Sequence, residues 1–146
     1  MDKHDIVAIL NQLVRLEQAG AALRLMESWV FVSPMSVDAL TAVERLAEAA
    51  ELNTAELSGL ILDLGGAPAH RAADPRSADL HFQEVAFVLP RLIAEQKVLL
   101  GKYALAAERL TGDSRASALV AQLADRHRET ISELALLNES PGVTSS

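Results

Sequence analysis

The chain has 146 residues, half of them hydrophobic but only 3% aromatic, with no cysteine and a formal net charge of -7. This length is enough for one domain with a sizeable core. The absence of cysteine excludes disulfides and thiolate metal sites. The negative charge argues against binding driven by nucleic-acid phosphates or by an anionic membrane. Because aromatic residues are scarce, aliphatic and alanine side chains have to build the core, which favours packed helices over a β-sandwich.

Hydrophobic residues recur at helical spacing in four long segments. The expected helices cover about residues 5–31, 37–64, 79–110 and 115–137. Ser33-Pro34 separates the first two, and Gly65-Gly66 followed by Pro68 is typical of a helix C-terminus. We expect residues 1–137 to form one bundle and residues 138–146 to be a flexible tail.

The lengths of the three links predict the topology of the bundle. The first link, "VSPMS", and the third, "TGDS", are short, whereas the middle link contains "APAHRAADPRSAD". Short links join antiparallel neighbours, and a long middle link allows a crossover between the second and third helices. The predicted fold is therefore an all-α four-helix bundle with one long crossover connection. The alternative is a simple up-down-up-down bundle, in which the middle link does not use its full length.

Two motifs resemble a known family. "LNQLVRLE" at residues 10–17 is similar to the first-helix signature of bacterioferritins, and "LILDLGGAP" at residues 60–68 is similar to the end of their second helix. The resemblance implies a ferritin-like fold. It also implies a di-iron centre held by four glutamates and two histidines, with one Glu-x-x-His pair on the second helix and another on the fourth.

The matching positions carry only part of that ligand set. The first-helix ligand falls on Glu17 and the third-helix ligand on Glu95, but the second-helix pair falls on Ala50 and Asn53. Alanine has no donor atom, and an amide oxygen is a weak ligand for a transition metal. On the fourth helix His127 is the nearest candidate. The resemblance therefore implies a degenerate di-iron site.

A carboxylate inside a bundle has to bind a metal, pair with a cation or take up a proton. Arg24 lies two helical turns after Glu17, so we expect its guanidinium to replace the lost metal charge beside Glu17 or Glu95. The alternative for the third-helix register is that Gln96 takes the inward position. We expect an interior polar network of Glu17, Arg24, Asn53, Glu95 and His127 at the former metal site.

Three functional interpretations follow from this site. The first is a bundle without a complete di-iron centre or cofactor, with a structural, regulatory or partner-binding role and no catalytic residues. The second is an iron-binding protein that oxidises Fe(II) or reduces peroxide through Glu17, Glu95 and His127. The third is small-molecule binding in the bundle interior.

A second hydrophobic stripe on the first two helices predicts association between copies of the chain. We expect a homodimer through these helices. The residues expected at its interface are Val14, Leu25, Trp29, Ala55, Gly59 and Leu62. The N-terminal stretch "MDKHDIVAIL" does not have the layout of a signal peptide, and we expect a cytoplasmic protein that binds neither nucleic acid nor membrane.

Overall fold

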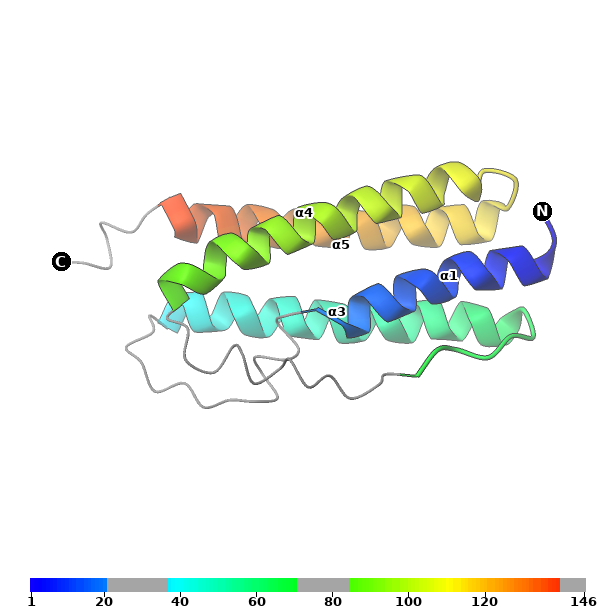
Figure 1. Ribbon diagram of the computed structural model, residues 1–146, viewed down its shortest axis with the longest axis horizontal. Helices are drawn as coiled ribbons and strands as arrows, with labels where there is room; N and C mark the ends of the chain where they lie inside the picture. Colours follow the sequence, from blue (N-terminus) through cyan, green and yellow to red (C-terminus); the bar gives the residue numbers. More distant parts are fainter. Residues whose placement is uncertain (21–36, 71–84, 140–146) are drawn as a thin grey trace.

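The computed structural model describes residues 1–20, 37–70 and 85–139. Within these ranges the regular structure is entirely helical. The four helices are α1 (Lys3–Gln18), α3 (Val37–Asp63), α4 (Val85–Arg109) and α5 (Ser114–Glu139), labelled as in Figure 1. The all-α bundle predicted from the sequence is confirmed.

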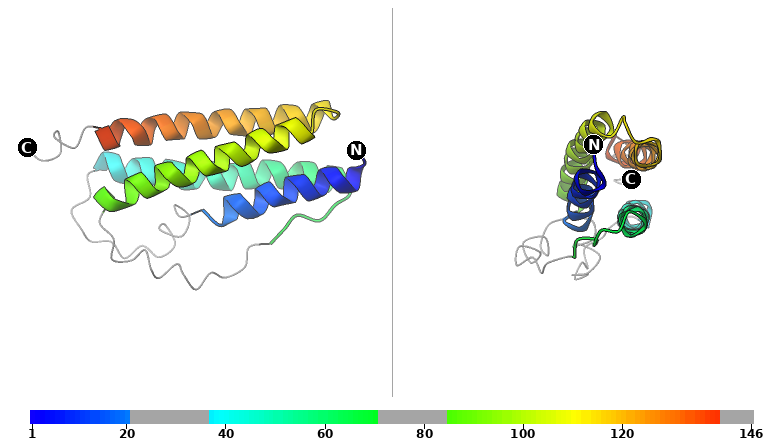
Figure 2. Two further views of the ribbon diagram at one scale, coloured as in Figure 1. Left: turned by 45° about the horizontal axis from the view of Figure 1, so that its top comes forward. Right: turned by 90° about the vertical axis from the view of Figure 1, so that its right-hand side faces the viewer.

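The four helices pack side by side along one long axis (Figures 1 and 2). Helix α1 packs on α3 and α4, and α5 packs on α3 and α4. In the end-on view of Figure 2, α3 and α4 occupy one diagonal of the bundle, and α1 and α5 the other. Sequence neighbours α1 and α3 run antiparallel, as do α4 and α5, whereas α3 and α4 run in the same direction. The connection between α3 and α4 therefore has to cross the length of the bundle, as the length of the middle link predicted.

Helix α1 is shorter than the hydrophobic pattern predicted. Its N-terminus is capped by Asp2, whose Oδ1 accepts a 2.9 Å hydrogen bond from the backbone N–H of Asp5. This bond lowers the pKa of the Asp2 carboxyl group. At the other end, the N–H of Gly20 bonds to the carbonyl of Glu17 at 3.3 Å, which tightens the last turn. The helix ends at Gln18, so the prediction of a continuous helix to Phe31 was wrong. A glycine just beyond the last turn favours this stop.

Helix α3 ends where its glycines predicted. Gly65 has a positive φ of 84°, its N–H bonds to the carbonyl of Leu62 at 3.0 Å, and the N–H of Gly66 bonds to the carbonyl of Ile61 at 2.9 Å. These two bonds define a Schellman cap. A Cβ atom on Gly66 would lie only 2.7 Å from a methyl group of Val7, so glycine permits the close approach of this turn to α1.

The segment after α3 is fastened to α1 by one amide side chain. Asn11 Nδ2 donates to the carbonyl of Ala67 at 2.9 Å, and Asn11 Oδ1 accepts from the N–H of Ala69 at 2.7 Å. The side chain thus satisfies one acceptor and one donor of a non-helical backbone. This is the structural role of Asn11 within the "LNQLVRLE" motif.

The main apolar core lies toward the end of the bundle formed by the α3 C-terminus and the α4–α5 turn. It is built almost entirely from aliphatic and alanine side chains, as the composition predicted, with Tyr103 as its single large aromatic. Its buried members on α1 include Ile6, Leu10 and Val14. None of the described helices is both long and apolar enough to span a bilayer.

Candidate functional site

Four polar side chains meet inside the bundle, one from each described helix. They are Glu17 of α1, Asn53 of α3, Tyr103 of α4 and His127 of α5, and each is at most 1% exposed. They lie at the edge of the apolar core, where each occupies an inward position of its own helical stripe. We refer to these four residues, with Arg126, as the interior network.

Glu17 is the centre of this network because three polar groups converge on one of its oxygens. Its Oε2 accepts hydrogen bonds from the hydroxyl of Tyr103 at 2.5 Å and from Nδ2 of Asn53 at 2.9 Å. Nε2 of His127 lies 2.6 Å from the same oxygen. Oε1, in contrast, is buried without a hydrogen-bond partner among the described groups. Hydrogen bonds to an acidic group are among the stronger ones, and these three stabilise a carboxylate that would otherwise be costly to bury.

The orientation of the Asn53 amide is set by Arg126. Arg126 Nη1 donates to Oδ1 of Asn53 at 2.6 Å and contacts Oε2 of Glu56 at 3.1 Å. A guanidinium has donors only, so the atom that faces it has to be the amide oxygen, and Nδ2 then points at Glu17. Asn53 therefore connects the buried acid to a half-buried cation, which polarises the amide toward Glu17.

The surroundings of His127 favour one tautomer. Nε2 lies 2.6 Å from Oε2 of Glu17 and 3.0 Å from Nδ2 of Asn53, whereas Nδ1 is buried with no partner in the described part of the chain. A buried N–H without an acceptor is costly, so the geometry favours a proton on Nε2, from which it is donated to Glu17. The imidazole also packs against the ring of Tyr103, with 5.4 Å between ring centroids.

Tyr103 is held in its protonated form. Burial raises the pKa of its hydroxyl, and the neighbouring negative charge and hydrogen-bond acceptor of Glu17 raise it further. The hydroxyl is thus a permanent donor at neutral pH. The hydrogen bond to Glu17 satisfies this hydroxyl inside the core.

Of the two other residues expected in the network, Glu95 is described and Arg24 is not. In α4 the inward position next to the network belongs to Gln96, which is 4% exposed, whereas Glu95 is half-buried near Gly20. This is the alternative register left open by the sequence. Arg24 lies outside the described residues. The cation that the structure does place at the network is Arg126.

The described residues do not fit the two-iron centre that the resemblance implies. Nowhere in residues 1–20, 37–70 and 85–139 do three or more His, Asp or Glu side chains gather as metal ligands. Ala50 offers no donor, and the amide oxygen of Asn53 already binds Arg126. Nδ1 of His127 faces away from Glu17, so one ion cannot bridge that nitrogen and the free oxygen of Glu17. The polar cluster contains three of the five residues expected in the network, Glu17, Asn53 and His127, and the described residues do not provide a complete ligand set.

Sequence reasoning did not assign two members of the interior network, Tyr103 and Arg126, and it also missed Glu56, the partner of Arg126. A signal was present, because Asn53 and Glu56 are three residues apart on α3 and therefore share a face. Arg126 immediately precedes His127 in the charged stretch "ADRHRET", where no spacing distinguishes it from an ordinary surface arginine.

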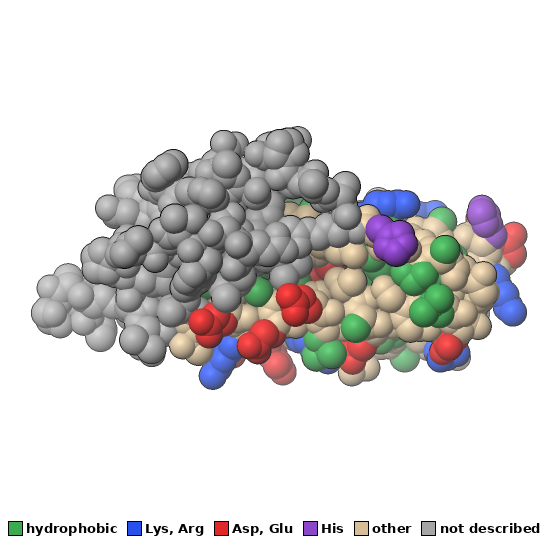
Figure 3. Space-filling model, turned by 90° about the horizontal axis from the view of Figure 1, so that it is seen from below, with side chains coloured by type: hydrophobic (Ala, Val, Ile, Leu, Met, Phe, Trp, Pro, Cys, Tyr) green, Lys and Arg blue, Asp and Glu red, His purple; other side chains and the backbone are tan. Residues whose placement is uncertain are grey.

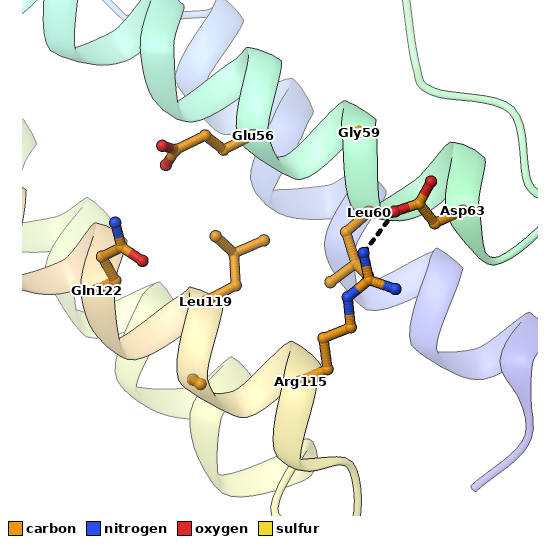
Figure 4. A pocket seen from close by; sticks show the side chains of 8 residues that line it. Glu56, Gly59, Leu60, Asp63, Arg115, Leu119 and Gln122 are labelled. Atoms are coloured by element: carbon orange, nitrogen blue, oxygen red, sulfur yellow. Dashed lines mark hydrogen bonds and ion pairs between the residues drawn. The ribbon is translucent and has the colours of Figure 1, made fainter.

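Two pockets of the described chain lie on the surface of the bundle rather than between the four network residues. The larger is an open groove of about 540 Å³ between α3 and α5, shown in Figure 4. Its floor is formed by small and aliphatic residues such as Gly59 and Leu119, and an ion pair of Asp63 with Arg115 closes one end. The second groove, of about 200 Å³, lies between α1 and α4.

The residues predicted for a dimer interface divide into three groups. Val14 is fully buried in the core of its own chain, so its assignment to an intermolecular surface was wrong. The helical phase of α1 turns Val14 inward beside Leu10 and Leu13. On α3, Ala55 and Gly59 are not buried, and Leu62 is 61% exposed. Leu25 and Trp29 lie outside the described residues.

Comparison with known proteins identifies the fold. No family model and no curated protein matches the sequence. The arrangement of the helices nevertheless defines a ferritin-like four-helix bundle. Among solved structures, the chain is similar to Dps from Thermosynechococcus elongatus, with 20% sequence identity and a TM-score of 0.67. The similarity covers 92% of this chain and 93% of that one.

Proposed function

We propose that this chain is a ferritin-like bundle that has lost its di-iron centre and has a non-catalytic structural, regulatory or partner-binding role. The observation that carries the proposal is the set of groups around the Glu17 carboxylate. It is the only carboxylate among the four side chains that meet inside the bundle, and hydrogen-bond donors of the protein surround one of its oxygens. Where a metal centre needs several acidic ligands, this site supplies an amide and a phenol.

The proposal includes association between copies of the chain through the α3 residues Ala55, Gly59 and Leu62. Exposed aliphatic side chains on a regular helix face support such a contact. We also propose that the protein is cytoplasmic, as expected from its sequence.

Titration with Fe(II), followed by elemental analysis and oxygen-uptake measurement, tests the metal-free interpretation. We expect less than one tightly bound iron per chain and no oxygen consumption above the rate without protein. One or two tightly bound ions per chain would reject the proposal in favour of an iron protein with an altered site.

A variant that restores the missing ligand pair provides the positive control. In A50E/N53H, a carboxylate and an imidazole return to the two α3 positions, one turn apart. We expect this variant to be less stable than the wild type without metal, because it buries new polar groups, and to gain thermal stability when a divalent metal is added. The melting temperature of the wild type should not respond to the same metal.

A further inference from the structure

Two helices of the bundle carry matching surface stripes on opposite faces. The α3 stripe consists of Glu48, Leu52, Ala55, Gly59 and Leu62. The α4 stripe consists of Val98, Lys102, Leu105 and Arg109. Six large hydrophobic residues of the described chain are exposed, and four of them lie on these stripes: Leu52 at 47%, Leu62 at 61%, Val98 at 64% and Leu105 at 56%. Such a concentration on two helices indicates surfaces that make contacts.

The two stripes carry opposite charges, and these charges form no ion pairs within the described chain. Glu48 on α3 forms no ion pair with any described residue, and the same holds for Lys102 and Arg109 on α4. In Figure 3, several acidic side chains lie close together on the described surface next to the grey residues, and hydrophobic side chains lie beside them. Lys102 and Arg109 flank the 200 Å³ groove between α1 and α4, whose remaining lining is mainly hydrophobic.

We propose that the α4 stripe and its groove bind the α3 stripe of a second copy of this chain, with the two helices antiparallel. The spacing of the residues carries this assignment. The two stripes have the same spacing when the helices run in opposite directions. The intervals are four, three and four residues, both from Glu48 through Leu52 and Ala55 to Gly59 and from Arg109 through Leu105 and Lys102 to Val98. In this register Glu48 faces Arg109 and Leu52 faces Leu105 over about 16 Å of helix. Val98 faces Gly59, where no atom lies within 4 Å of the point that a Cβ would occupy.

The contact is heterologous, because different surfaces of the two copies meet. Helices α3 and α4 lie on one diagonal of the bundle, so their exposed faces point in opposite directions (Figure 2). One partner therefore cannot occupy both faces of the same chain, and each added copy offers a free stripe to the next. The resulting assembly contains more than two copies of the 15.6 kDa chain. This inference rests on the self-association part of the proposed function and names a different counterpart from the α1 surface predicted by the sequence.

Disulfide cross-linking tests the register, since the natural chain has no cysteine. We expect a mixture of L52C and L105C chains to form an intermolecular disulfide several-fold faster than L52C alone. A mixture of L52C and L136C is the matched control, because Leu136 lies outside both stripes and is at least as exposed as Leu105, at 66% against 56%. Preferential cross-linking of L52C with itself would show a two-fold contact between α3 helices. That result would overturn this inference while leaving self-association intact.

Charge reversal with sedimentation analysis gives an independent readout. K102E/R109E should reduce the average mass toward that of one chain. Combining these changes with E48K/E51K in the same chain should restore assembly. Glu51 is exposed on α3 one turn before Ala55, which faces Lys102 in this register, so the four substitutions exchange the charges across the contact. K3E/R128E changes the net charge by the same amount at exposed positions outside both stripes and should leave the mass unchanged. A wild-type chain that stays monomeric at low salt would refute both this contact and the self-association proposal, but not the metal-free interpretation.

Discussion

At the scale of single residues, the interior network shows how a buried acid is accommodated without a directly bonded guanidinium in the described structure. Glu17 receives its stabilisation from a phenol, an amide and an imidazole. Arg126 contributes through the amide of Asn53 rather than by touching the carboxylate. This arrangement keeps the cation near the surface, where its desolvation costs less than full burial would.

The hydroxyl of Tyr103 gives a pH-dependent signature for this network. Its pKa is raised in the folded chain above the ordinary value near 10, so the unfolded chain releases this proton at lower pH than the folded chain. The sign follows from linkage: the contribution is fully present below about pH 10 and is lost as pH rises above that value. We expect the free energy of unfolding to fall there by up to about 1.4 kcal/mol per pH unit from this group.

Y103F is the matching variant, and the chain has no other tyrosine to obscure the result. At neutral pH it should be less stable by about 1–3 kcal/mol in urea unfolding, since a buried acceptor loses a donor. Above pH 10 its stability should decline less steeply than that of the wild type. Equal alkaline slopes for the two proteins would show that Tyr103 titrates normally and would contradict the hydrogen bond to Glu17.

At the scale of helices, the hydrophobic pattern predicted the order of the four described helices and, except for the C-terminus of α1, their approximate ends, because aliphatic periodicity directly reports the buried face. It could not set the register of α4 near the network. The buried residues in this part of α4 are Leu92, Gln96, Leu99 and Tyr103, yet the spacing of Glu95 also fits the same stripe. Neighbouring residues differ by about 100° around a helix, so tertiary packing decides between them.

The end of α1 illustrates a second limit. The hydrophobic stripe continues past Gln18, but Gly20 and the cap at Ala19 end the helix. Periodicity alone cannot weigh a favourable apolar spacing against a local stop signal. A related limit applies to the site. Glu17, Asn53 and His127 could be identified by their positions in the sequence. Arg126 could not, because it joins the network through a contact between α5 and α3 that no local pattern encodes.

The cap of α3 supplies an element-scale prediction. Gly65 has a positive φ, so G65A should destabilise the chain by about 1–2 kcal/mol through backbone strain. G101A is the matched control, because Gly101 lies inside α4 with no atom within 4 Å of its added Cβ. That variant should instead be more stable by about 0.5–1 kcal/mol. Thermal unfolding in high salt, where association is weak, measures both; equal effects of the two substitutions would contradict the assignment of the cap.

At the scale of the whole molecule, the interior network divides the bundle into two unequal parts. On one side lies the continuous apolar core, which includes residues 57–61 of α3, 103–110 of α4 and 116–124 of α5. On the other side the described buried side chains come from only three helices, because α1 ends beside the network at Gln18. Burial of apolar surface is the main source of stability, so the two parts should differ in local stability.

Native-state hydrogen exchange measures this difference residue by residue. We expect the slowest amides at residues 57–61 and 120–124, with opening free energies close to that of global unfolding. The amides at residues 43–50 and 130–134 should exchange faster, through local opening of the end beyond the network. In the Y103F chain the contrast should increase, because a weaker network couples the two parts less tightly. Uniform protection along α3 and α5 would show instead that the bundle opens as a single unit, and that Glu17 and its partners do not mark a boundary within it.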